Sequence, residues 1–163
     1  MRRWVVDTSP LLFLSKLDRL ELLRKSADSL LVPPAVWSEV EARRDEATER
    51  VQHALRAAWL DLRKPMDSPG PDLESLRGIG EIEVLLLAQE VDAERVVLDD
   101  LNARREARRR GLTPVGTLGL LLAARLRGEV TSLAEEIHRL EEAGFRASPA
   151  LIAAVLRSAG EQP

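Results

Sequence analysis

The stretch WVVDTSP, residues 4–10, decides the fold class of this chain. Three consecutive apolar residues, two of them β-branched, are typical of a strand buried on both faces of a parallel sheet. The closing proline cannot continue a strand ladder but is favoured in the first turn of a helix. Asp7 is therefore expected at the carboxyl end of a first strand, where open α/β sheets bind their ligands. The alternative is that Asp7, Thr8 or Ser9 only caps the helix that begins near Leu11.

Apolar runs and helical patterns alternate along the rest of the chain. A short apolar run bounded by polar or turn residues predicts a strand, and apolar spacing of three and four residues predicts a helix. This alternation argues for a three-layer α/β/α sandwich with a central parallel sheet. The predicted strands are residues 4–6, 30–32, 59–63, 95–98 and 113–115, and the predicted helices are residues 11–17, 20–23, 81–91, 101–110, 117–127, 132–143 and 149–159. A further helix is predicted to begin near Ala35, and helical spacing continues over residues 47–58 after the charged stretch EARRDEATER at 41–50.

The domain organisation follows from the length and from one long loop. The 163 residues are enough for one domain with a substantial core. Residues 64–80 carry three prolines and three glycines, which predict a long loop of the kind that is often functional. This loop is not expected to be a domain boundary, because the strands on its two sides need one another in one sheet. We expect a single domain over residues 1–163, with a core at 1–127 and a helical C-terminal extension at 128–163.

Composition and charge exclude several classes of protein. Without cysteine the chain has no disulfide, thiolate metal site or cysteine nucleophile, which suits a reducing cytoplasm. No apolar run approaches the roughly 18 residues of a membrane span, so no membrane association is expected. The net charge of −3 gives no global reason to expect a nucleic-acid partner. The sequence therefore predicts a soluble, cytoplasmic globular protein.

One local segment is strongly basic. The predicted helix at 101–110 is rich in arginine, which is a good bidentate partner for phosphate. It is the best local candidate for a nucleic-acid contact. The alternative, a solvated helix face, is equally well supported, because exposed helices are often charged. The arginines are Arg104, Arg105, Arg108, Arg109 and Arg110.

Two predicted strands end in aspartate, and two predicted helices carry a glutamate near their start. Asp7 follows the first strand, and Asp99 and Asp100 follow the fourth. Because the carboxyl ends of parallel strands lie on one edge of a sheet, we expect these carboxylates to converge with Glu39 and Glu81. Carboxylates in one pocket repel one another unless a cation compensates. Oxygen ligands favour Mg²⁺ or Mn²⁺, which can activate water for attack on a phosphodiester.

Each of these residues also has a plainer interpretation. Glu39 fits a solvated helix face, and Glu81 fits a first helical turn, where the helix dipole favours a carboxylate. Asp99 or Asp100 can cap the helix that follows. Arg104 can orient an aspartate, bind substrate phosphate or lie on the surface without a role.

Six motifs follow one another along nearly the whole chain, apart from the middle around residues 42–77. They are VVDTSPLLFLSKL, VPPAVWSEV, GIGEIEVLLLAQE, VVLDDLNARREARRRG, VGTLGLLLAARLRGEV and EEAGFRASPALIAAVLRSAGE. In this order and spacing they resemble the PIN-domain family, in the branch related to VapC-type toxin ribonucleases. The resemblance implies a ribonuclease that depends on Mg²⁺ or Mn²⁺ and acts on single-stranded or structured RNA. It also implies an antitoxin protein as a partner and a homodimer.

The resemblance assigns roles to individual residues. The third acidic position of the family, usually aspartate in VapC-type proteins, falls on Glu81, and the fourth falls on Asp100 or Asp99. The longer glutamate side chain keeps a second hypothesis open, a nucleic-acid-binding or regulatory module with weak or no catalysis. The implied catalytic residues are Asp7, Glu39, Glu81, Asp99 and Asp100; the implied metal ligands are Asp7, Glu81, Asp99 and Asp100; and the implied substrate-binding residues are Thr8, Ser9, Arg104 and Arg108.

Overall fold

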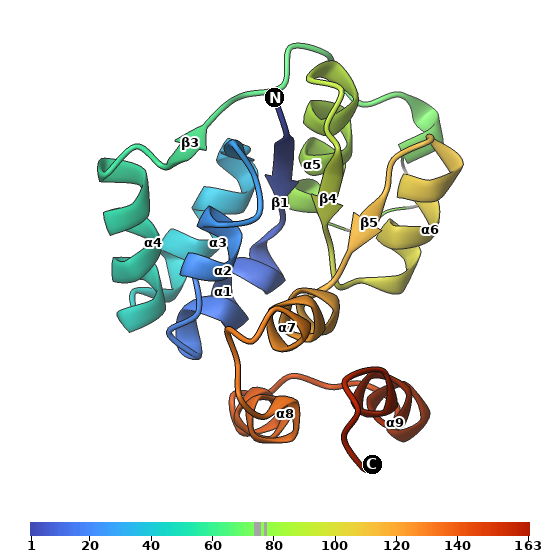
Figure 1. Ribbon diagram of the computed structural model, residues 1–163. Coiled ribbons are helices and arrows are strands. Elements are labelled where there is room, and N and C mark those ends of the chain that lie inside the picture. The colour runs from blue at the N-terminus through green and yellow to red at the C-terminus, as the bar shows by residue number, and fades with distance from the viewer. Residues whose placement is uncertain (74–75, 77) are drawn as a thin grey trace.

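A parallel sheet forms the centre of the molecule, with helices around it (Figure 1). The computed structural model describes residues 1–73, 76 and 78–163, and within these ranges the five strands have the order β3-β2-β1-β4-β5. Every pair of neighbouring strands is parallel, which confirms the predicted three-layer α/β/α sandwich. The strands are β1 (Arg3–Val6), β2 (Ser29–Val32), β3 (Leu60–Leu62), β4 (Arg95–Val97) and β5 (Pro114–Val115).

β1 occupies the middle of the sheet and is bonded to parallel strands on both sides. Val5 pairs with β2 on one side and with β4 on the other. Val5 and Val6 are fully buried, as expected for a strand that is covered on both faces. The backbone N–H of Asp7 continues the ladder and donates to the carbonyl oxygen of Val97 at 3.0 Å. The sheet therefore holds the backbone of Asp7 beside the end of β4.

Nine α-helices lie in the described part of the chain, and the last two form the C-terminal extension. These two pack against α7 and against one another (Figure 1). The carboxylate of Glu161 accepts the backbone N–H of Leu133 at 2.7 Å and pairs with Arg125 at 3.0 Å, which ties the extension to α7. No helix among residues 1–73, 76 and 78–163 is long and apolar enough to cross a membrane. The helices are α1 (Thr8–Lys16), α2 (Glu21–Arg24), α3 (Pro34–Arg43), α4 (Glu46–Arg56), α5 (Ile79–Glu90), α6 (Leu101–Arg109), α7 (Thr117–Leu126), α8 (Leu133–Glu142) and α9 (Pro149–Ser158).

The helix predicted from Ala35 and the helical spacing over residues 47–58 correspond to two separate helices, α3 and α4. Arg44 adopts a left-handed conformation with φ of 50°, which ends α3. Asp45 then starts α4 through a capping box, in which its carboxylate accepts the backbone N–H of Thr48 at 3.1 Å. The charged stretch between the two helices is therefore a turn with its own hydrogen bonds.

α1 and α5 both begin earlier than the sequence predicts. α1 begins at Thr8, so that Pro10 lies in its first turn, where the missing N–H of proline costs nothing. α5 begins at Ile79, inside the predicted loop, of which residues 74, 75 and 77 lie outside the described residues. Glu81 consequently lies in the first turn of α5, close to the carboxyl edge of the sheet.

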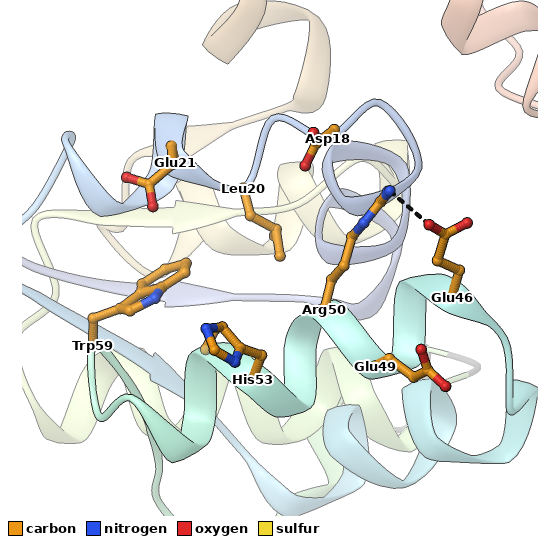
Figure 2. A pocket seen from close by; sticks show the side chains of 9 residues that line it. Asp18, Leu20, Glu21, Glu46, Glu49, Arg50, His53 and Trp59 are labelled. Atoms are coloured by element: carbon orange, nitrogen blue, oxygen red, sulfur yellow. Dashed lines mark hydrogen bonds and ion pairs between the residues drawn. The ribbon is translucent and has the colours of Figure 1, made fainter.

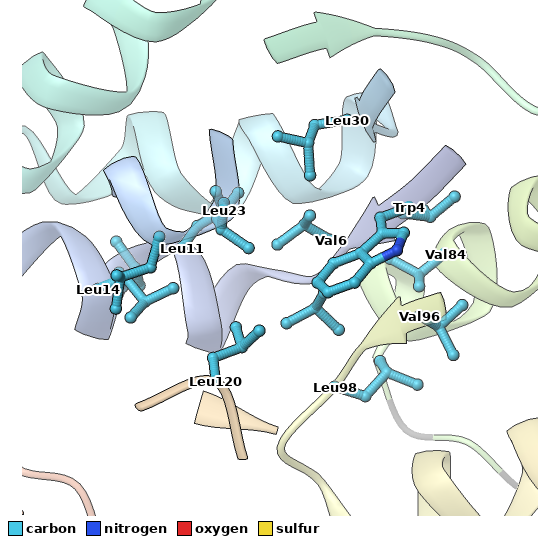
Figure 3. Close-up of a cluster of buried hydrophobic side chains, with 14 of the residues drawn as sticks. Trp4, Val6, Leu11, Leu14, Leu23, Leu30, Val84, Val96, Leu98 and Leu120 are labelled. Atoms are coloured by element: carbon cyan, nitrogen blue, oxygen red, sulfur yellow. The ribbon is translucent and has the colours of Figure 1, made fainter. Parts of the chain in front are cut away.

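Leucine and valine side chains fill the space between the sheet and the helices (Figure 3). Leu11 and Leu14 of α1 are fully buried, and they gather with Leu120 of α7 and Val6 of β1. Burial of this kind contributes roughly 1.5–3 kcal/mol for each large side chain. The core therefore holds α1, and with it the polar residues at its start, in a fixed position on the sheet.

Truncation in this core is expected to be costly. We expect Leu14→Ala to lower the free energy of unfolding by about 3 kcal/mol, because the substitution leaves a cavity that the packed helices cannot fill. Leu126→Ala, at a position that is 64% exposed, is the matched control and should change it by less than about 0.5 kcal/mol. Urea denaturation of the two variants measures both values, and equal losses would contradict this description of the core.

Candidate functional site

The predicted acidic residues surround the carboxyl ends of β1 and β4. Val6 pairs with Val97, so the two strands end side by side, and Asp7 and Asp99 follow them at the same edge. A cavity of about 280 Å³ opens there between α1, α3 and the start of α5. Three acidic residues line it, Asp7, Glu39 and Glu81, and its other lining residues include Thr8, Ser9 and Gly78. Of the five carboxylates predicted to converge, Asp7, Glu39 and Glu81 line this cavity, whereas Asp99 and Asp100 are not among its lining residues in the described part of the chain.

Asp7 is the most deeply buried carboxylate of this cavity. Asp7 is only 6% exposed, and burial raises the pKa of its carboxyl group to about 7 from the usual 3.8. The backbone N–H of Thr8 works against this shift, whereas the negative charges of Glu81, Glu39 and Asp99 add to it. Asp7 is the N-cap residue of α1, but its side chain makes no capping hydrogen bond within the described part of the chain. The capping alternative is thus wrong for Asp7.

The hydroxyls that follow Asp7 do not cap the helix either. Ser9 Oγ donates to Asp99 Oδ2 at 2.9 Å, so it holds a carboxylate rather than a backbone group. Thr8 Oγ1 is buried and has no hydrogen-bond partner among the described residues. A buried hydroxyl without a partner is costly in a finished structure. Because Thr8 lines the cavity, it remains available to a ligand there.

Glu39 and Glu81 come together because α3 and α5 approach closely at a glycine. A Cβ atom at Gly80 would lie 2.9 Å from Glu39 Oε1, so a larger residue there would push this carboxylate away from its present position. Glu81 is half-buried, and its pKa is raised by burial and then by the charges of Asp100 and Glu39. Glu39 itself is exposed, at the mouth of the cavity. Two helices far apart in sequence therefore contribute carboxylates to one site.

Asp99 is held by hydrogen bonds from two helices. In addition to Ser9 of α1, the backbone N–H and the Oγ1 of Thr117 both donate to it at 2.7 Å. The glycine before Thr117 is required here, since a Cβ atom at Gly116 would lie 3.0 Å from Asp99 Oδ1. Thr117 has no role in the prediction from sequence, although a glycine followed by threonine at a helix start is a recognisable signal. Asp99 therefore links β4 to the starts of α1 and α7.

Asp100 does cap a helix, as one alternative predicts. Its Oδ2 accepts the backbone N–H of Ala103 at 2.9 Å, at the start of α6. Its negative charge also raises the pKa of Glu81, so Asp100 is near enough to act on the charge of that carboxylate. Capping and participation in the acidic cluster are compatible, because the cap occupies one carboxylate oxygen. Of the two neighbouring aspartates, Asp100 is the one coupled to Glu81.

Arg104 lies beside Asp99 but forms no ion pair with an aspartate among the described residues. Its Nη1 donates to the carbonyl oxygen of Leu98 at 3.2 Å, and it would clash with a Cβ atom at Gly116. Its pKa is lowered by burial and by the charge of Arg108, one turn along α6, whereas Asp99 raises it. Arg104 therefore keeps a cation next to the cluster without neutralising it.

The basic run of α6 is not one continuous surface. Arg109 and Arg110 both pair with the buried Glu106 at 3.0 Å, and Arg110 also pairs with Asp72. The side chain of Arg110 is only 14% exposed. These pairs leave Arg104, Arg105 and Arg108 as the arginines of the run without an ion pair among the described residues.

The cluster has the donor atoms of a divalent-cation site but not a closed set of ligands. Among residues 1–73, 76 and 78–163, no three histidine, cysteine, aspartate or glutamate side chains are close enough to hold a metal ion. Burial and the charges of neighbouring carboxylates raise the pKa values of Asp7 and Glu81, and a bound cation would offset that repulsion. The Oγ1 of Thr8 has no hydrogen-bond partner among the described residues. The residues present therefore fit a Mg²⁺ or Mn²⁺ ion in chemistry.

A second cavity, of about 350 Å³, lies between the start of α2 and the length of α4 (Figure 2). Trp59 and Leu20 form apolar parts of its lining, and Arg50 pairs there with Glu46 at 2.9 Å. None of the five predicted catalytic carboxylates lines this cavity among the described residues. It is therefore separate from the acidic cluster.

The raised pKa of Asp7 predicts a pH-dependent stability. The pKa of Asp7 is about 7 in the folded state, against 3.8 as the ordinary value expected in the unfolded state. The free energy of unfolding should therefore be unaffected by Asp7 below about pH 4, and should fall as the pH rises through 7. Three pKa units correspond to about 4 kcal/mol. In chelator-treated buffer, Asp7→Asn should be more stable than the parent by up to this amount at pH 8, and nearly equal to it at pH 4.

Asp92→Asn is the matched control for this measurement. Asp92 is exposed in the turn after α5, with φ of 52°, a conformation that asparagine adopts equally well. Its free energy of unfolding should follow that of the parent at both pH values. A difference between Asp7→Asn and the parent that stays constant with pH would contradict the burial of a charged Asp7.

Comparisons with known proteins agree with this arrangement. A comparison with protein families matches residues 3–161 to the PIN domain. A comparison with curated proteins found no match. The matched span contains the whole sheet and all five acidic residues of the candidate site, and it confirms the resemblance to PIN domains inferred from the sequence. The chain belongs to the PIN-domain family.

Proposed function

We propose that this protein is a metal-dependent ribonuclease, which cleaves RNA by hydrolysis of phosphodiester bonds. PIN domains have a nuclease-type fold, and this supports action on nucleic acid. The observation that carries the proposal is the buried Asp7, which shares a cavity with Glu39 and Glu81 and has a pKa of about 7. Burial of a carboxylate beside other carboxylates lowers the stability of the fold, because the charge loses its hydration and the negative charges repel one another. Such an arrangement is therefore better explained by function than by stability.

The residues divide into roles by their surroundings. Asp7 and Glu81, which share the cavity, are the carboxylates that we propose to contact a Mg²⁺ or Mn²⁺ ion. Asp100 would add negative charge beside Glu81, and Asp99 would remain a carboxylate that is already hydrogen-bonded. When bound, the ion would neutralise charge that develops on the phosphodiester. The exposed Glu39 is suited to accept a proton from the attacking water, because its carboxylate faces the mouth of the cavity.

Other side chains position the reacting groups. Ser9 and Thr117 hold Asp99, which in turn fixes the end of β4 next to Asp7. Ser9 thus acts on the site through Asp99, whereas Thr8 has a free hydroxyl that can contact substrate or bound water. Arg104 and Arg108 are the cations on the α6 side that we propose to bind substrate phosphate.

Two finer features follow from the resemblance to VapC-type toxins. We propose that the protein acts as the toxin of a toxin–antitoxin pair, with a small antitoxin protein as its inhibitor. We also propose a homodimer. Leu151 of α9 is 49% exposed and lies on a largely apolar helix, which supports a contact of this kind.

A second candidate function is a PIN domain that binds nucleic acid without turnover. The absence of a closed ligand set among the described residues favours it, as does glutamate at the third acidic position. RNA binding that persists without cleavage throughout a Mg²⁺ and Mn²⁺ titration would favour this candidate. Metal-dependent turnover would exclude it.

Removal of the Asp7 charge should abolish cleavage. We expect purified protein to cleave single-stranded RNA in the presence of Mg²⁺ or Mn²⁺, and chelation of the metal to stop it. Asp7→Asn should lower the rate at least 100-fold, because the central carboxylate is lost while its shape is kept. Asp92→Asn, the same change at an exposed turn, should cleave like the parent. Unchanged cleavage by Asp7→Asn would refute the proposed function.

A methyl group at Gly80 should separate activity from stability. In Gly80→Ala the new Cβ displaces Glu39, and a displacement of about 1 Å can cost roughly 100-fold in rate. The helix itself should be unchanged or more stable by up to about 1 kcal/mol, since alanine is the better helix former. Cleavage assays and thermal unfolding measure the two effects, and a proportional loss of both would contradict this role for Gly80.

A further inference from the structure

The cavity of the acidic cluster is acidic at one end and basic at the other. Besides the carboxylates, it is lined by Phe13 and Lys16 of α1 and by Arg43 of α3. Lys16 is the last residue of α1, and Arg43 is the last residue of α3. Both cations therefore lie at the far ends of helices whose earlier residues border the carboxylates.

Helix geometry separates the two ends by a few nucleotides. Along α1, Ser9 and Lys16 are seven residues apart on the same face, which corresponds to a rise of about 10 Å. Along α3, Glu39 and Arg43 are one turn apart, a rise of about 6 Å. With a rise of roughly 3.4 Å per nucleotide in a stacked strand, these distances span about two to three nucleotides.

Lys16 lies in the last turn of α1, where the helix dipole favours a cation, and its Nζ donates a hydrogen bond to a backbone carbonyl, but no carboxylate neutralises its charge among the described residues. Its Nζ lies 3.4 Å from the carbonyl oxygen of Ala143 and 5.4 Å from the centre of the Phe13 ring. It forms no ion pair with any of the described residues. Phe13 is itself fixed by an edge-to-face contact with Phe145, with ring centroids 5.2 Å apart. Lys16 is therefore a positioned cation whose charge stays available.

Arg43 is similarly available. Its Nε lies 3.4 Å from Asp45 Oδ2, and both side chains are about 40% exposed, so the pair contributes at most about 1 kcal/mol. Asp45 already serves as the cap of α4 through Thr48. The guanidinium can exchange this weak partner for an anion at small cost, and arginine binds phosphate in a bidentate manner.

The dimensions of the cavity indicate an unpaired strand. The cavity of about 280 Å³ is near the lower limit of pockets that hold small ligands, and Asp7 lies at its buried base. An unpaired strand can bring a phosphodiester into so small a cavity without having to accommodate a second strand. A single strand can enter and continue along α1 and α3 towards the two cations.

We infer that Arg43 and Lys16 each bind a backbone phosphate of an unpaired nucleic-acid strand, about two and about three nucleotides, respectively, from the phosphodiester that lies at the carboxylates. This inference rests on the proposed function, because it assumes that the strand enters the acidic end of the cavity. Arg104 and Arg108 lie on α6, so the strand would meet cations on both sides of the cluster. A basic end for the cavity also lets a protein with a net charge of −3 bind an anionic strand.

The salt dependence of binding tests the inference. Asp7→Asn protein in Mg²⁺ is titrated with a fluorescent single-stranded oligoribonucleotide between 50 and 300 mM salt. Each phosphate contact contributes about 0.7 to the slope of log affinity against log salt. Lys16→Gln or Arg43→Gln should make this slope shallower by about 0.7 and weaken binding about fivefold at 0.1 M salt. In the double variant the slope should become shallower by about twice as much as in either single variant. Lys16→Arg should keep the slope of the parent.

Two control variants remove the same charge elsewhere. Lys25→Gln and Arg56→Gln lie at the exposed ends of α2 and α4, outside the cavity, and should leave the slope unchanged. An annealed duplex of the same sequence should bind more weakly, without sensitivity to Lys16. A parent slope in both Lys16→Gln and Arg43→Gln, or an equal loss in the controls, would overturn the inference.

The outcome separates this inference from the proposed function. RNA cleavage by the unmodified protein together with unchanged slopes would overturn the inference and keep the proposed function. Shallower slopes in a protein that never cleaves RNA would support the phosphate contacts and remove the proposed function. The absence of any RNA binding would overturn both.

Discussion

The parallel pairing of β1 with β4 is the constraint on which the site depends. The hydrogen bond from the backbone N–H of Asp7 to the carbonyl oxygen of Val97 extends that pairing to the last position before α1. It places one carboxylate beside the residues that follow β4, although about ninety positions separate them in the chain. Helices α3 and α5 then bring their glutamates to an edge that the two strands have already defined. A shift in this pairing would move every carboxylate of the cluster.

The site is arranged at a cost in stability, and nearby residues limit that cost. Most of this loss of stability comes from Asp7, since its carboxylate is buried among other negative charges. Asp99 avoids it by accepting hydrogen bonds from Ser9 and Thr117. Gly80 and Gly116 allow side chains to approach the backbone closely enough for these contacts. The fold therefore stabilises Asp99 by hydrogen bonds and leaves Asp7 as a buried carboxylate whose charge no nearby cation compensates among the described residues.

Charge on this molecule is organised by tertiary structure and not by sequence segments. The arginine-rich helix α6 gives much of its charge to internal pairs with Glu106 and Asp72. No motif or charge cluster in the sequence indicates a role for Lys16 and Arg43, yet both line the same cavity as the carboxylates. A count of charges along the chain therefore overestimates the positive charge that α6 exposes, and it does not identify Lys16 and Arg43. The relevant quantity is whether a cation has a partner in the folded state.

The sequence alone determined the parallel α/β/α architecture and the candidate carboxylates, because buried strands and helices have distinct apolar periods and parallel strands end at one edge. It did not determine that Asp100 caps α6 while Asp99 is held by Thr117, since neighbouring aspartates look alike until their partners are placed. It also did not locate the break between α3 and α4 within the charged stretch at 41–50, which depends on the left-handed Arg44. The approach of Glu39 to Gly80 and the basic end of the cavity arise from contacts between distant helices, and only the tertiary structure decides those.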